Sequence, residues 1–427
     1  MLIGDGGPVV ARVVAVVGGG CSGVLMAREL LRCSDDDVVL VEPGEPGGGV
    51  AYGSAQPWHL LNSRAGAMSA DPDDPGHFVR WAATTPAAFR PRAEYGRYLR
   101  TVLDEAAAAH PGRLHLRRAR AAAITPDATV ALDDGSAIAA DHVVLATGGP
   151  AAARQGVVHP HYIADPWRPG VLDSLPADRP VLLVGTGLTA VDVALTLTAD
   201  GRRTAPVVAV SRRGLLPLTH TADAAPPAVP SLDDCATLRD VVRAVRAAAG
   251  EAGDWRPIVD GLRPYLDELW TALTPAEQDA FLRHLARPWE CHRHRMAPEI
   301  GARVAGLRAA GLLEIRAGGV AAWPGLADFA AVVNCAGPGR LPAAAGPLVG
   351  GLLAAGLARL GPHGLGLDID VDGRLIGAGG RPHDRLWVIG PLRRGAQWET
   401  TAVPEIRAQA RRLVTDLHSG AQVAAAA

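Results

Sequence analysis

The stretch Ala11–Glu42, ARVVAVVGGGCSGVLMARELLRCSDDDVVLVE, decides how we interpret this chain. Its run Ala11–Val17 is rich in β-branched residues, which favour strands. The loop Gly18–Gly23 follows with the pattern G-x-G-x-x-G, and the apolar residues after it are spaced as on a helix. A second apolar run, Val38–Val41, ends in Glu42, 19 residues after the loop. The stretch therefore predicts a strand–loop–helix–strand unit of the Rossmann type.

The residue types in this unit suit a dinucleotide. Gly18 permits a tight turn, Gly20 lets the backbone approach a pyrophosphate, and Gly23 lets helix and strand pack closely. Ser22 lies in the first turn of the helix, whose unpaired N–H groups favour phosphates. An acid such as Glu42 accepts hydrogen bonds from the ribose hydroxyls. The alternative is a structural glycine turn with Glu42 at the surface.

A second loop, Gly185–Ala190, has the pattern G-x-G-x-x-A and follows the apolar run Pro180–Val184. A helical pattern continues after it, as it does after the first loop. The sequence therefore predicts a second dinucleotide site in the same chain. Its expected binding residues are Gly185, Gly187, Leu188 and Thr189.

The strand expected after the second loop does not end in an acid. It ends in Ser211-Arg212-Arg213, with Arg212 lying 22 residues after Ala190. Arginines at this place favour the 2′-phosphate of NADP, which a guanidinium can bind through two hydrogen bonds. These three residues therefore indicate NADPH in preference to NADH. The alternative is an exposed, solvated arginine pair.

The composition narrows the class of protein. A chain of 427 residues predicts two or three domains, and 48% hydrophobic with 20% charged residues is typical of soluble globular proteins. The net charge of −2 and the absence of a like-charged tail argue against a nucleic-acid or membrane partner. All 42 basic residues are arginine, so no lysine can form a Schiff base. The oligomeric state stays open, and a homo-oligomer is compatible with the sequence.

The cysteines argue against two kinds of site. None of the five forms a Cys-x-x-Cys pair, which disfavours a disulfide-reductase centre and a zinc site. We expect no metal, because the pair His292 and His294 has no third ligand at a spacing typical of a metal site. Scattered cysteines in odd number favour a reducing, cytoplasmic compartment. No run of about 18 apolar residues occurs, so no spanning helix is expected.

Two dinucleotide sites in one chain indicate that electrons pass from one cofactor to the other. Together the two loops resemble those of the two-dinucleotide-binding flavoprotein superfamily. This superfamily includes flavin-containing monooxygenases, Baeyer–Villiger monooxygenases and amine N-hydroxylases. The chain is most similar to a bacterial group of FAD/NAD(P)-binding proteins. The segments that carry this resemblance are Gly49–Gly53, Leu60–Ser63, Met68–Asp71, Tyr95–Tyr98, Val144–Gly148, Ser211–Gly214, Trp289 with His292–Met296, and Trp398–Arg407.

The resemblance implies FAD at the first loop, NADPH at the second, and an α/β fold with two Rossmann-like domains. The FAD domain would comprise residues 1–150 and 311–427, and the NADPH domain residues 151–230 and 300–310. Residues 231–299 would form a helical insertion, a lid on the substrate side. The helical spacing of Leu238, Val241 and Val242 and a capping box at Thr274–Glu277 support helices there.

The resemblance also implies residues around the flavin. Thr147 and Gly148 lie where the chain crosses between the domains, and Gly390 ends the last strand beside the flavin. Many relatives have Gly-Asp at that strand end, whereas this chain has Gly390-Pro391. A helix that begins near Thr400 and Thr401 would point its N-terminus at the flavin N1–C2=O edge and stabilise negative charge. The alternative is a core helix.

Six further positions are candidates for chemistry or substrate binding. Asn62 and Trp398 are the expected catalytic residues, because an amide at Asn62 can hydrogen-bond the flavin ring. The alternative for Asn62 is a turn residue that satisfies its own backbone. His292, Arg293, His294 and Arg295 could bind an anionic group of the substrate. The alternative for these four is a solvated or salt-bridged helix face.

The function that the resemblance implies is an NADPH-dependent flavoprotein monooxygenase acting on a small, amine or amino-acid-like metabolite. Molecular oxygen would add at the flavin C4a position before transfer to the substrate. The first alternative is an NADPH-dependent flavin reductase or dehydrogenase without oxygen insertion. His159–Trp167 supports it, because this segment matches the monooxygenase motif Phe-x-Gly-x-x-x-His-x-x-x-Trp only in part. The second alternative is a flavin-binding redox sensor that does not turn over.

Overall fold

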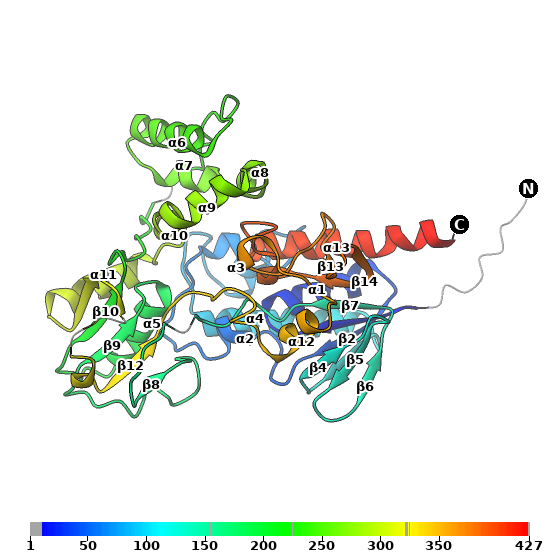
Figure 1. Ribbon diagram of the computed structural model, residues 1–427, viewed down its shortest axis with the longest axis horizontal. Helices are drawn as coiled ribbons and strands as arrows, with labels where there is room; N and C mark the ends of the chain where they lie inside the picture. The colour runs from blue at the N-terminus through cyan, green and yellow to red at the C-terminus, as the bar shows by residue number, and fades with distance from the viewer. Residues whose placement is uncertain (1–10, 154, 224, 321–322, 324, 426–427) are drawn as a thin grey trace, which may run out of the picture.

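The computed structural model describes residues 11–153, 155–223, 225–320, 323 and 325–425. Two mainly parallel β-sheets lie next to each other, and a group of helices stands above the junction between them (Figure 1). This arrangement confirms the predicted α/β class. We call the larger sheet with the elements that cover it the first unit, and the smaller sheet with its helices the second unit.

The first unit is built on a six-stranded sheet. Its strand order is β13 (Arg374–Ile376), β14 (Pro382–Val388), β7 (His142–Leu145), β1 (Val13–Val17), β2 (Asp37–Val41) and β3 (Leu114–Arg117). Strand β1 pairs in parallel with both β2 and β7, so it lies in the middle of the sheet. Both faces of a parallel sheet are usually covered, which explains the uninterrupted apolar run in β1.

Alternate residues of β1 point to opposite faces of this sheet. Val14 and Val16 pack against three helices on one face, and Ala15 and Val17 pack against a small sheet and one helix on the other. The three helices are α1 (Cys21–Cys33), α4 (Arg92–Ala109) and α13 (Val403–Ala425). The opposite cover consists of β4 (Ala121–Ile124), β5 (Thr129–Leu132), β6 (Ala137–Ala139) and α12 (Pro347–Ala354).

The second unit is built on a five-stranded sheet. Its order is β11 (Leu313–Ala317), β10 (Val207–Ser211), β9 (Val181–Val184), β12 (Ala331–Asn334) and β8 (Tyr162–Ile163). The pairings between these five strands are parallel. One face is covered by α5 (Leu188–Leu197) and α11 (Pro298–Ala309). The shorter elements of the chain are α2 (Gly49–Tyr52), α3 (His77–Trp81) and 3-10 turns at Ala65–Ala67, Arg263–Tyr265, Leu326–Asp328, Pro362–Gly364 and Gly390–Arg393.

One predicted boundary is wrong. The sequence led us to expect that the chain returns to the first unit at residue 311. Strand β11 pairs instead with β10, and β12 pairs with β9, so both belong to the second sheet. The return therefore lies after Asn334. A short apolar strand fits either parallel sheet equally well, so its residues do not indicate which neighbour it will pair with.

The helical insert consists of residues 238–293. Its helices are α6 (Leu238–Ala252), α7 (Arg256–Gly261), α8 (Leu266–Ala272), α9 (Pro275–His284) and α10 (Ala286–Arg293). The predicted capping box at Thr274 and Glu277 is confirmed, and Glu277 also accepts a hydrogen bond from the Leu238 N–H at 3.0 Å. No helix among the described residues is both long enough and apolar enough to cross a bilayer.

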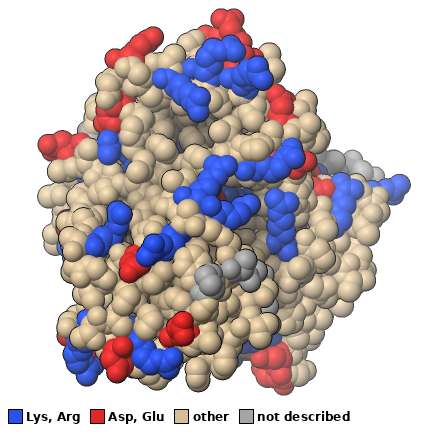
Figure 2. All heavy atoms as spheres, turned by 60° about the vertical axis from the view of Figure 1, so that its left-hand side comes forward, with Lys and Arg blue, Asp and Glu red and all other residues tan. Residues whose placement is uncertain are grey.

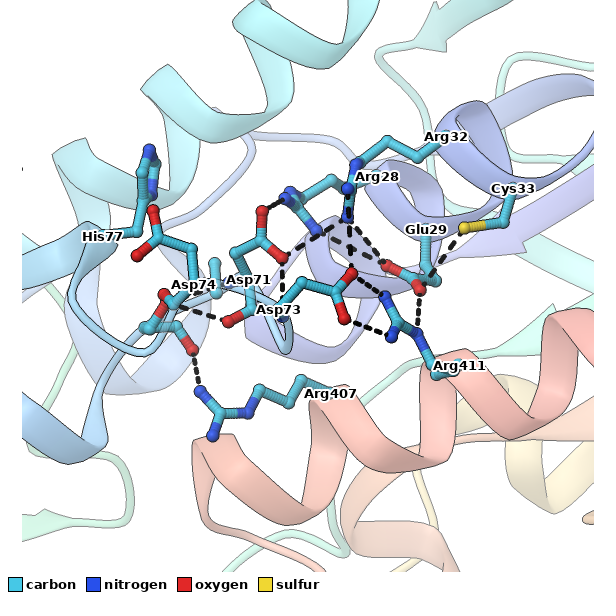
Figure 3. A network of polar contacts seen from close by, with 12 residues as sticks. Arg28, Glu29, Arg32, Cys33, Asp71, Asp73, Asp74, His77, Arg407 and Arg411 are labelled. Carbon is cyan, nitrogen blue, oxygen red and sulfur yellow. Dashed lines mark hydrogen bonds and ion pairs between the residues drawn. The ribbon is translucent and has the colours of Figure 1, made fainter.

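A network of charges fixes α13 against α1 and the loop before α3 (Figure 3). Arg411 donates to Glu29 at 2.7 Å and to Asp73 at 2.6 Å, and Arg28 pairs with Asp71 at 2.5 Å. The Glu29 side chain is only 3% exposed, so its charge needs these partners. The network thereby sets where the N-terminus of α13 lies relative to the first glycine loop.

Buried polar contacts join the two units. Arg92 of α4 donates to Asp192 of α5 at 2.5 Å, with side-chain exposures of 16% and 6%. His59 lies 2.9 Å from the Thr196 hydroxyl of the same helix α5. These contacts hold the second glycine loop, which precedes α5, in a fixed relation to the first unit.

Replacing Asp192 by asparagine should lower the free energy of unfolding by about 3 kcal/mol, because it leaves the buried Arg92 charge without its counter-ion. Denaturant unfolding of the full chain measures this. Asp200→Asn is the matched control, since Asp200 pairs with Arg202 at an exposed turn where both side chains are largely in solvent. Equal midpoints for the Asp192→Asn variant and wild type would show that the Arg92–Asp192 pair does not hold the units together.

Candidate functional site

The two glycine loops have the same backbone hydrogen bonds. The Gly18 N–H donates to the Val41 carbonyl at 2.9 Å, and the Gly185 N–H donates to the Val210 carbonyl at 2.8 Å. In each case the first glycine of the loop is bonded to the strand that follows the helix. The two motifs quoted from the sequence therefore form equivalent structures in the two units.

Both first glycines adopt a conformation that disfavours side chains. Gly18 has φ +106° and Gly185 has φ +120°. A Cβ at Gly18 would lie 2.6 Å from the Ala146 carbonyl oxygen, and one at Gly185 would lie 2.4 Å from that of Cys335. Each loop thus passes directly over the end of the neighbouring parallel strand, β7 in the first unit and β12 in the second.

The third residue of each loop caps a helix and leaves its N-terminus accessible to an anion. Gly20 precedes α1 and Gly187 precedes α5, and neither helix has a side-chain cap. A Cβ at Gly20 would come no closer than 3.7 Å to its neighbours, and one at Gly187 no closer than 3.9 Å. The first N–H groups of both helices are therefore suited to phosphate oxygens. Leu188 and Thr189 form the first turn of α5.

Gly23 has a different role from Gly20. A Cβ at Gly23 would lie 1.7 Å from the Gly18 carbonyl oxygen, so α1 approaches the loop as closely as the backbone permits. Ser22 beside it is buried against Gly390, where a Cβ would meet the Ser22 hydroxyl at 2.3 Å. The sequence predicted close packing at Gly23, whereas the contact between Ser22 and Gly390 was not predicted.

The strand ends that follow the two helices differ in charge. Glu42, after β2, accepts from the Gly19 N–H at 2.7 Å and from the Gly44 N–H at 3.0 Å. A carboxylate offers about four acceptor positions, so two remain for a ribose diol. Ser211, at the end of β10, instead places a neutral hydroxyl 2.8 Å from that of Thr186. In the part of the chain that the structure describes, no carboxylate accepts from the second loop as Glu42 does from the first, so none is placed there to repel a 2′-phosphate.

Arg212 and Arg213 follow Ser211 and are exposed. Arg213 donates to the His284 carbonyl at 3.0 Å, which ties it to the insert. Arg212 makes no hydrogen bond or ion pair with the described part of the chain, so its guanidinium is available to a ligand. Arginine side chains gather across the middle of the face that carries the second unit and the insert (Figure 2).

The expected flavin-side residues lie at the carboxyl ends of adjacent strands. Thr147 and Gly148 follow β7, and Gly390 follows β14, the two strands on one side of β1. Gly390 has φ +78°, and its N–H donates to the Gln409 side chain of α13 at 2.8 Å. These ends and the first glycine loop meet at one edge of the sheet, the place where open α/β sheets bind ligands.

Thr400 carries a buried donor without a partner. It is fully buried, and its hydroxyl has no hydrogen-bond partner among the described residues. Thr401 next to it is exposed, and α13 begins at Val403, three residues later than Thr400. Such a hydroxyl costs free energy unless another group accepts from it. A flavin carbonyl at the start of α13 would supply that acceptor.

Trp398 does not occupy the position expected for a catalytic residue. It is 7% exposed, and its ring lies 4.8 Å from that of Trp270 and 4.9 Å from that of Phe281, both in the insert. The Arg394 guanidinium stacks on it at 4.7 Å. This packing favours a structural role, in which Trp398 joins the insert to the first unit.

Asn62 lies at the junction of the two units. Its backbone carbonyl is 3.1 Å from the His220 ring nitrogen of the second unit. Its side chain is partly buried, and no hydrogen bond from its amide to the described residues is present. The amide is therefore free to bind a ligand between the units. Its hydrogen bond to the flavin ring stays a prediction.

The two arginines among His292–Arg295 pair with acids from other segments, so the four residues do not form an open anion site. Arg293 donates to Glu399 at 3.1 Å, and the buried Arg295 pairs with Asp260. The His292 ring packs edge-on against Trp255 at 4.6 Å. This arrangement favours the salt-bridged alternative over substrate binding, because the guanidinium charges are already neutralised. Nor do three ligating side chains gather to form a metal site anywhere in the described ranges.

The cysteine in the first glycine loop is not set up for redox chemistry. Burial raises the pKa of the Cys21 thiol to about 12. The thiolate is the reactive form of cysteine, so Cys21 is inert at neutral pH. Cys21 begins α1 and packs against the core of the first unit, which favours a packing role.

Sequence reasoning missed two contributors to this region. Arg287 of α10 lies over the second glycine loop, where its Nη2 donates to the Thr186 carbonyl at 3.1 Å. The Arg92–Asp192 pair joins the units from helices 100 residues apart. Neither has a local motif, because each contact depends on tertiary packing and not on spacing along the chain.

Three partly buried histidines should make stability depend on pH. Burial lowers the pKa of His142 and of His220 to about 4, and that of His294 to about 3, from an ordinary value of 6.5. Below pH 6.5 the unfolded chain binds protons that the folded chain does not, so stability falls as pH drops from 6.5 to 4. We expect a loss of about 1.4 kcal/mol per pH unit for each histidine, or about 4 kcal/mol per pH unit for the three together.

Denaturant unfolding at a series of pH values measures this slope. His142→Gln should flatten it, because glutamine can still accept from Trp387 Nε1, which lies 3.3 Å from His142 Nδ1, but does not titrate. A wild-type slope in this variant would show that His142 does not contribute to the pH dependence of stability.

Comparisons with known proteins agree with this geometry. Residues 15–150 match a family model described as FAD-NAD(P)-binding, a range that contains the first glycine loop, Glu42 and Gly148. Among curated proteins, the sequence comparison found no match.

Several solved structures are similar in fold. An ornithine N-hydroxylase from Kutzneria sp. 744 has a TM-score of 0.60 at 15% identity, over 96% of this chain and 99% of that chain. A cadaverine monooxygenase of desferrioxamine biosynthesis from Erwinia amylovora has a TM-score of 0.64 at 14% identity, over 96% and 95%. The thioredoxin reductase of Lactococcus lactis has a TM-score of 0.51 at 12% identity, over 96% and 98%.

At these identities the likeness establishes a shared fold. The chain shares the two-unit α/β fold of these proteins, as the sequence predicted. Oxygenases and a disulfide reductase share this fold, so the reaction must be argued from the site.

Proposed function

We propose that this protein is an FAD- and NADPH-dependent monooxygenase that acts on a small amine or amino-acid-like substrate. The observation that carries the proposal is the pair of equivalent glycine loops with different strand ends. The first loop has the carboxylate of Glu42 beside it, and the second has a neutral serine followed by two exposed arginines. One chain thus offers two dinucleotide sites with distinct preferences.

The residues of the first unit fit FAD. Gly20 leaves room for a pyrophosphate, and Glu42 retains acceptor positions for ribose. The unpartnered Thr400 hydroxyl, just before α13, fits a flavin carbonyl. When bound, the flavin would take a hydride from the nicotinamide and pass electrons to molecular oxygen, the expected co-substrate.

The residues of the second unit fit NADPH. Gly187 leaves room for a second pyrophosphate, and Arg212 has an unengaged guanidinium for the 2′-phosphate. The junction between the units, at Asn62 and His220, is where the two cofactors would meet. We place the protein in the cytoplasm, since its cysteines are free thiols.

We base the substrate class on two solved structures of similar fold. One is named as an ornithine N-hydroxylase and the other as a cadaverine monooxygenase. The inert Cys21 argues against disulfide reduction as the reaction, because the thiol in the first glycine loop is not suited to it.

The test is incubation of the FAD-loaded protein with NADPH, isotopically labelled oxygen and a panel of diamines and basic amino acids. We expect one substrate to yield a product that carries a single labelled oxygen atom, in proportion to NADPH consumed. Hydrogen peroxide in equal amount to NADPH, with no oxygenated product from any substrate, would contradict the monooxygenase.

A second candidate is an NADPH-dependent flavin reductase without oxygen insertion. The segment His159–Trp167 favours it, because it matches the monooxygenase motif Phe-x-Gly-x-x-x-His-x-x-x-Trp only in part. Transfer of electrons from NADPH to an artificial acceptor at the same rate with and without oxygen, with no oxygenated product, would favour this candidate.

A further inference from the structure

The second glycine loop is covered by an arginine of the helical insert. Arg287 lies in the first turn of α10, and its side chain is 29% exposed. Its Nη2 donates to the Thr186 carbonyl at 3.1 Å, to the Thr186 hydroxyl at 3.3 Å and to the Leu215 carbonyl. The arginine therefore bridges the loop and the segment that follows β10.

The other terminal nitrogen of Arg287 faces the open side of the loop. Nη1 lies 3.9 Å from the position of a Cβ at Gly187, and no other neighbouring atom of the described chain comes within 4 Å of that position. Among the described residues, the acid within 4 Å of Nη1 is Glu290, whose carboxylate lies 3.9 Å away, too far for a hydrogen bond. The N–H groups of Nη1 therefore make no hydrogen bond to the described residues, and they lie where the loop would meet a pyrophosphate.

Among the described residues, no arginine covers the first loop in this way. The position of a Cβ at Gly20 is approached only by the Gly49 backbone, at 3.7 Å. The cation over the second loop is therefore a particular feature of this unit and not a general consequence of the glycine motif.

Helix α10 also reaches the first unit. Glu290 accepts from Arg394 at 3.2 Å, and Arg293 donates to Glu399 at 3.1 Å. Both partners lie in the segment that leads to Thr400. One helix of eight residues thus connects the second glycine loop with the segment next to the expected flavin site.

We infer that Arg287 binds the pyrophosphate of the nicotinamide coenzyme, and that the insert thereby closes over the second site. The inference rests on the proposed NADPH site and adds to it a residue from outside the Rossmann unit. Nη1 would donate to a phosphate oxygen while Nη2 keeps its bonds to the loop. Arg287 is then specific for the pyrophosphate, whereas Arg212 and Arg213 are specific for the 2′-phosphate.

Two probes separate these roles. NADP⁺ carries both the pyrophosphate and the 2′-phosphate, whereas adenosine 2′-monophosphate carries only the 2′-phosphate. Calorimetric titration of the full, FAD-loaded chain with each probe gives two dissociation constants. We expect Arg287→Met to weaken NADP⁺ at least tenfold, which is about 1.4 kcal/mol. The affinity for adenosine 2′-monophosphate should stay within twofold, because its binding residues are untouched.

Arg283→Met is the matched control, because Arg283 is an exposed arginine of the same insert, bonded to the Asp279 carbonyl. It should bind both probes like wild type. Arg287→Lys keeps the charge and should lose less NADP⁺ affinity than Arg287→Met. NADP⁺ affinity within twofold of wild type in Arg287→Met, or an equal loss for both probes, would overturn the inference. Failure of wild type to bind either probe would overturn the proposed NADPH site itself, and the inference with it.

Discussion

A Gly20→Ala variant should fold like wild type and lose its FAD. A Cβ at Gly20 would sit in ordinary contact with the protein, 3.7 Å from Gly49, so the apoprotein has room for it. The same methyl group would stand where a pyrophosphate must approach the loop and the N-terminus of α1. Loss of hydrogen bonds to a charged phosphate costs on the order of 3 kcal/mol, or roughly 100-fold in affinity.

The measurement is the flavin absorbance that remains after gel filtration, with circular dichroism to monitor folding. Gly187→Ala is the matched control in the second loop and should keep FAD while it loses NADP⁺. Gly23→Ala should instead lower the thermal stability of the protein itself, because its Cβ would lie 1.7 Å from the Gly18 carbonyl oxygen. A fully yellow Gly20→Ala protein would rule out FAD at the first loop.

The double substitution Arg212→Ala with Arg213→Ala should change coenzyme preference. Hydrogen bonds to a charged group contribute about 1.5–3 kcal/mol each, so the loss of two guanidinium groups should raise the KM for NADPH roughly 100-fold. The KM for NADH should change little, because NADH has no 2′-phosphate. Of the two single variants, Arg212→Ala should have the larger effect, since Arg213 is already bonded to the His284 carbonyl.

Steady-state oxidation of both coenzymes by the FAD-loaded protein measures this ratio. Arg202→Ala is a suitable control, because Arg202 is an exposed arginine of the same unit that pairs with Asp200. Equal increases in KM for NADPH and NADH would contradict a role for these arginines at the 2′-phosphate.

The sequence predicted the parts of the fold that depend on local pattern. The loops at Gly18 and Gly185 were recognisable because a positive φ and a close approach to the next strand require glycine at fixed spacing. The charge contrast between Glu42 and Arg212 was visible because each follows an apolar strand at the expected distance from its loop. The Thr274 capping box was visible for the same reason.

What the sequence did not predict depends on which distant segments pack together. Strand β11 could have paired in either sheet, and it pairs with β10. Arg293 and Arg295 were expected to bind substrate, but acids from distant segments, Glu399 and Asp260, neutralise them. Trp398 was expected near the flavin, but it packs against Trp270 of the insert. In each case the deciding partner is more than 30 residues away in the chain.

The most direct test of two dinucleotide sites in one chain is the visible spectrum of the FAD-reconstituted protein, mixed without oxygen with NADPH or with NADH. We expect a yellow protein whose flavin absorbance bleaches with NADPH at concentrations far below those needed for NADH. A protein that stays colourless after incubation with FAD, or a yellow protein that neither coenzyme bleaches, would contradict it.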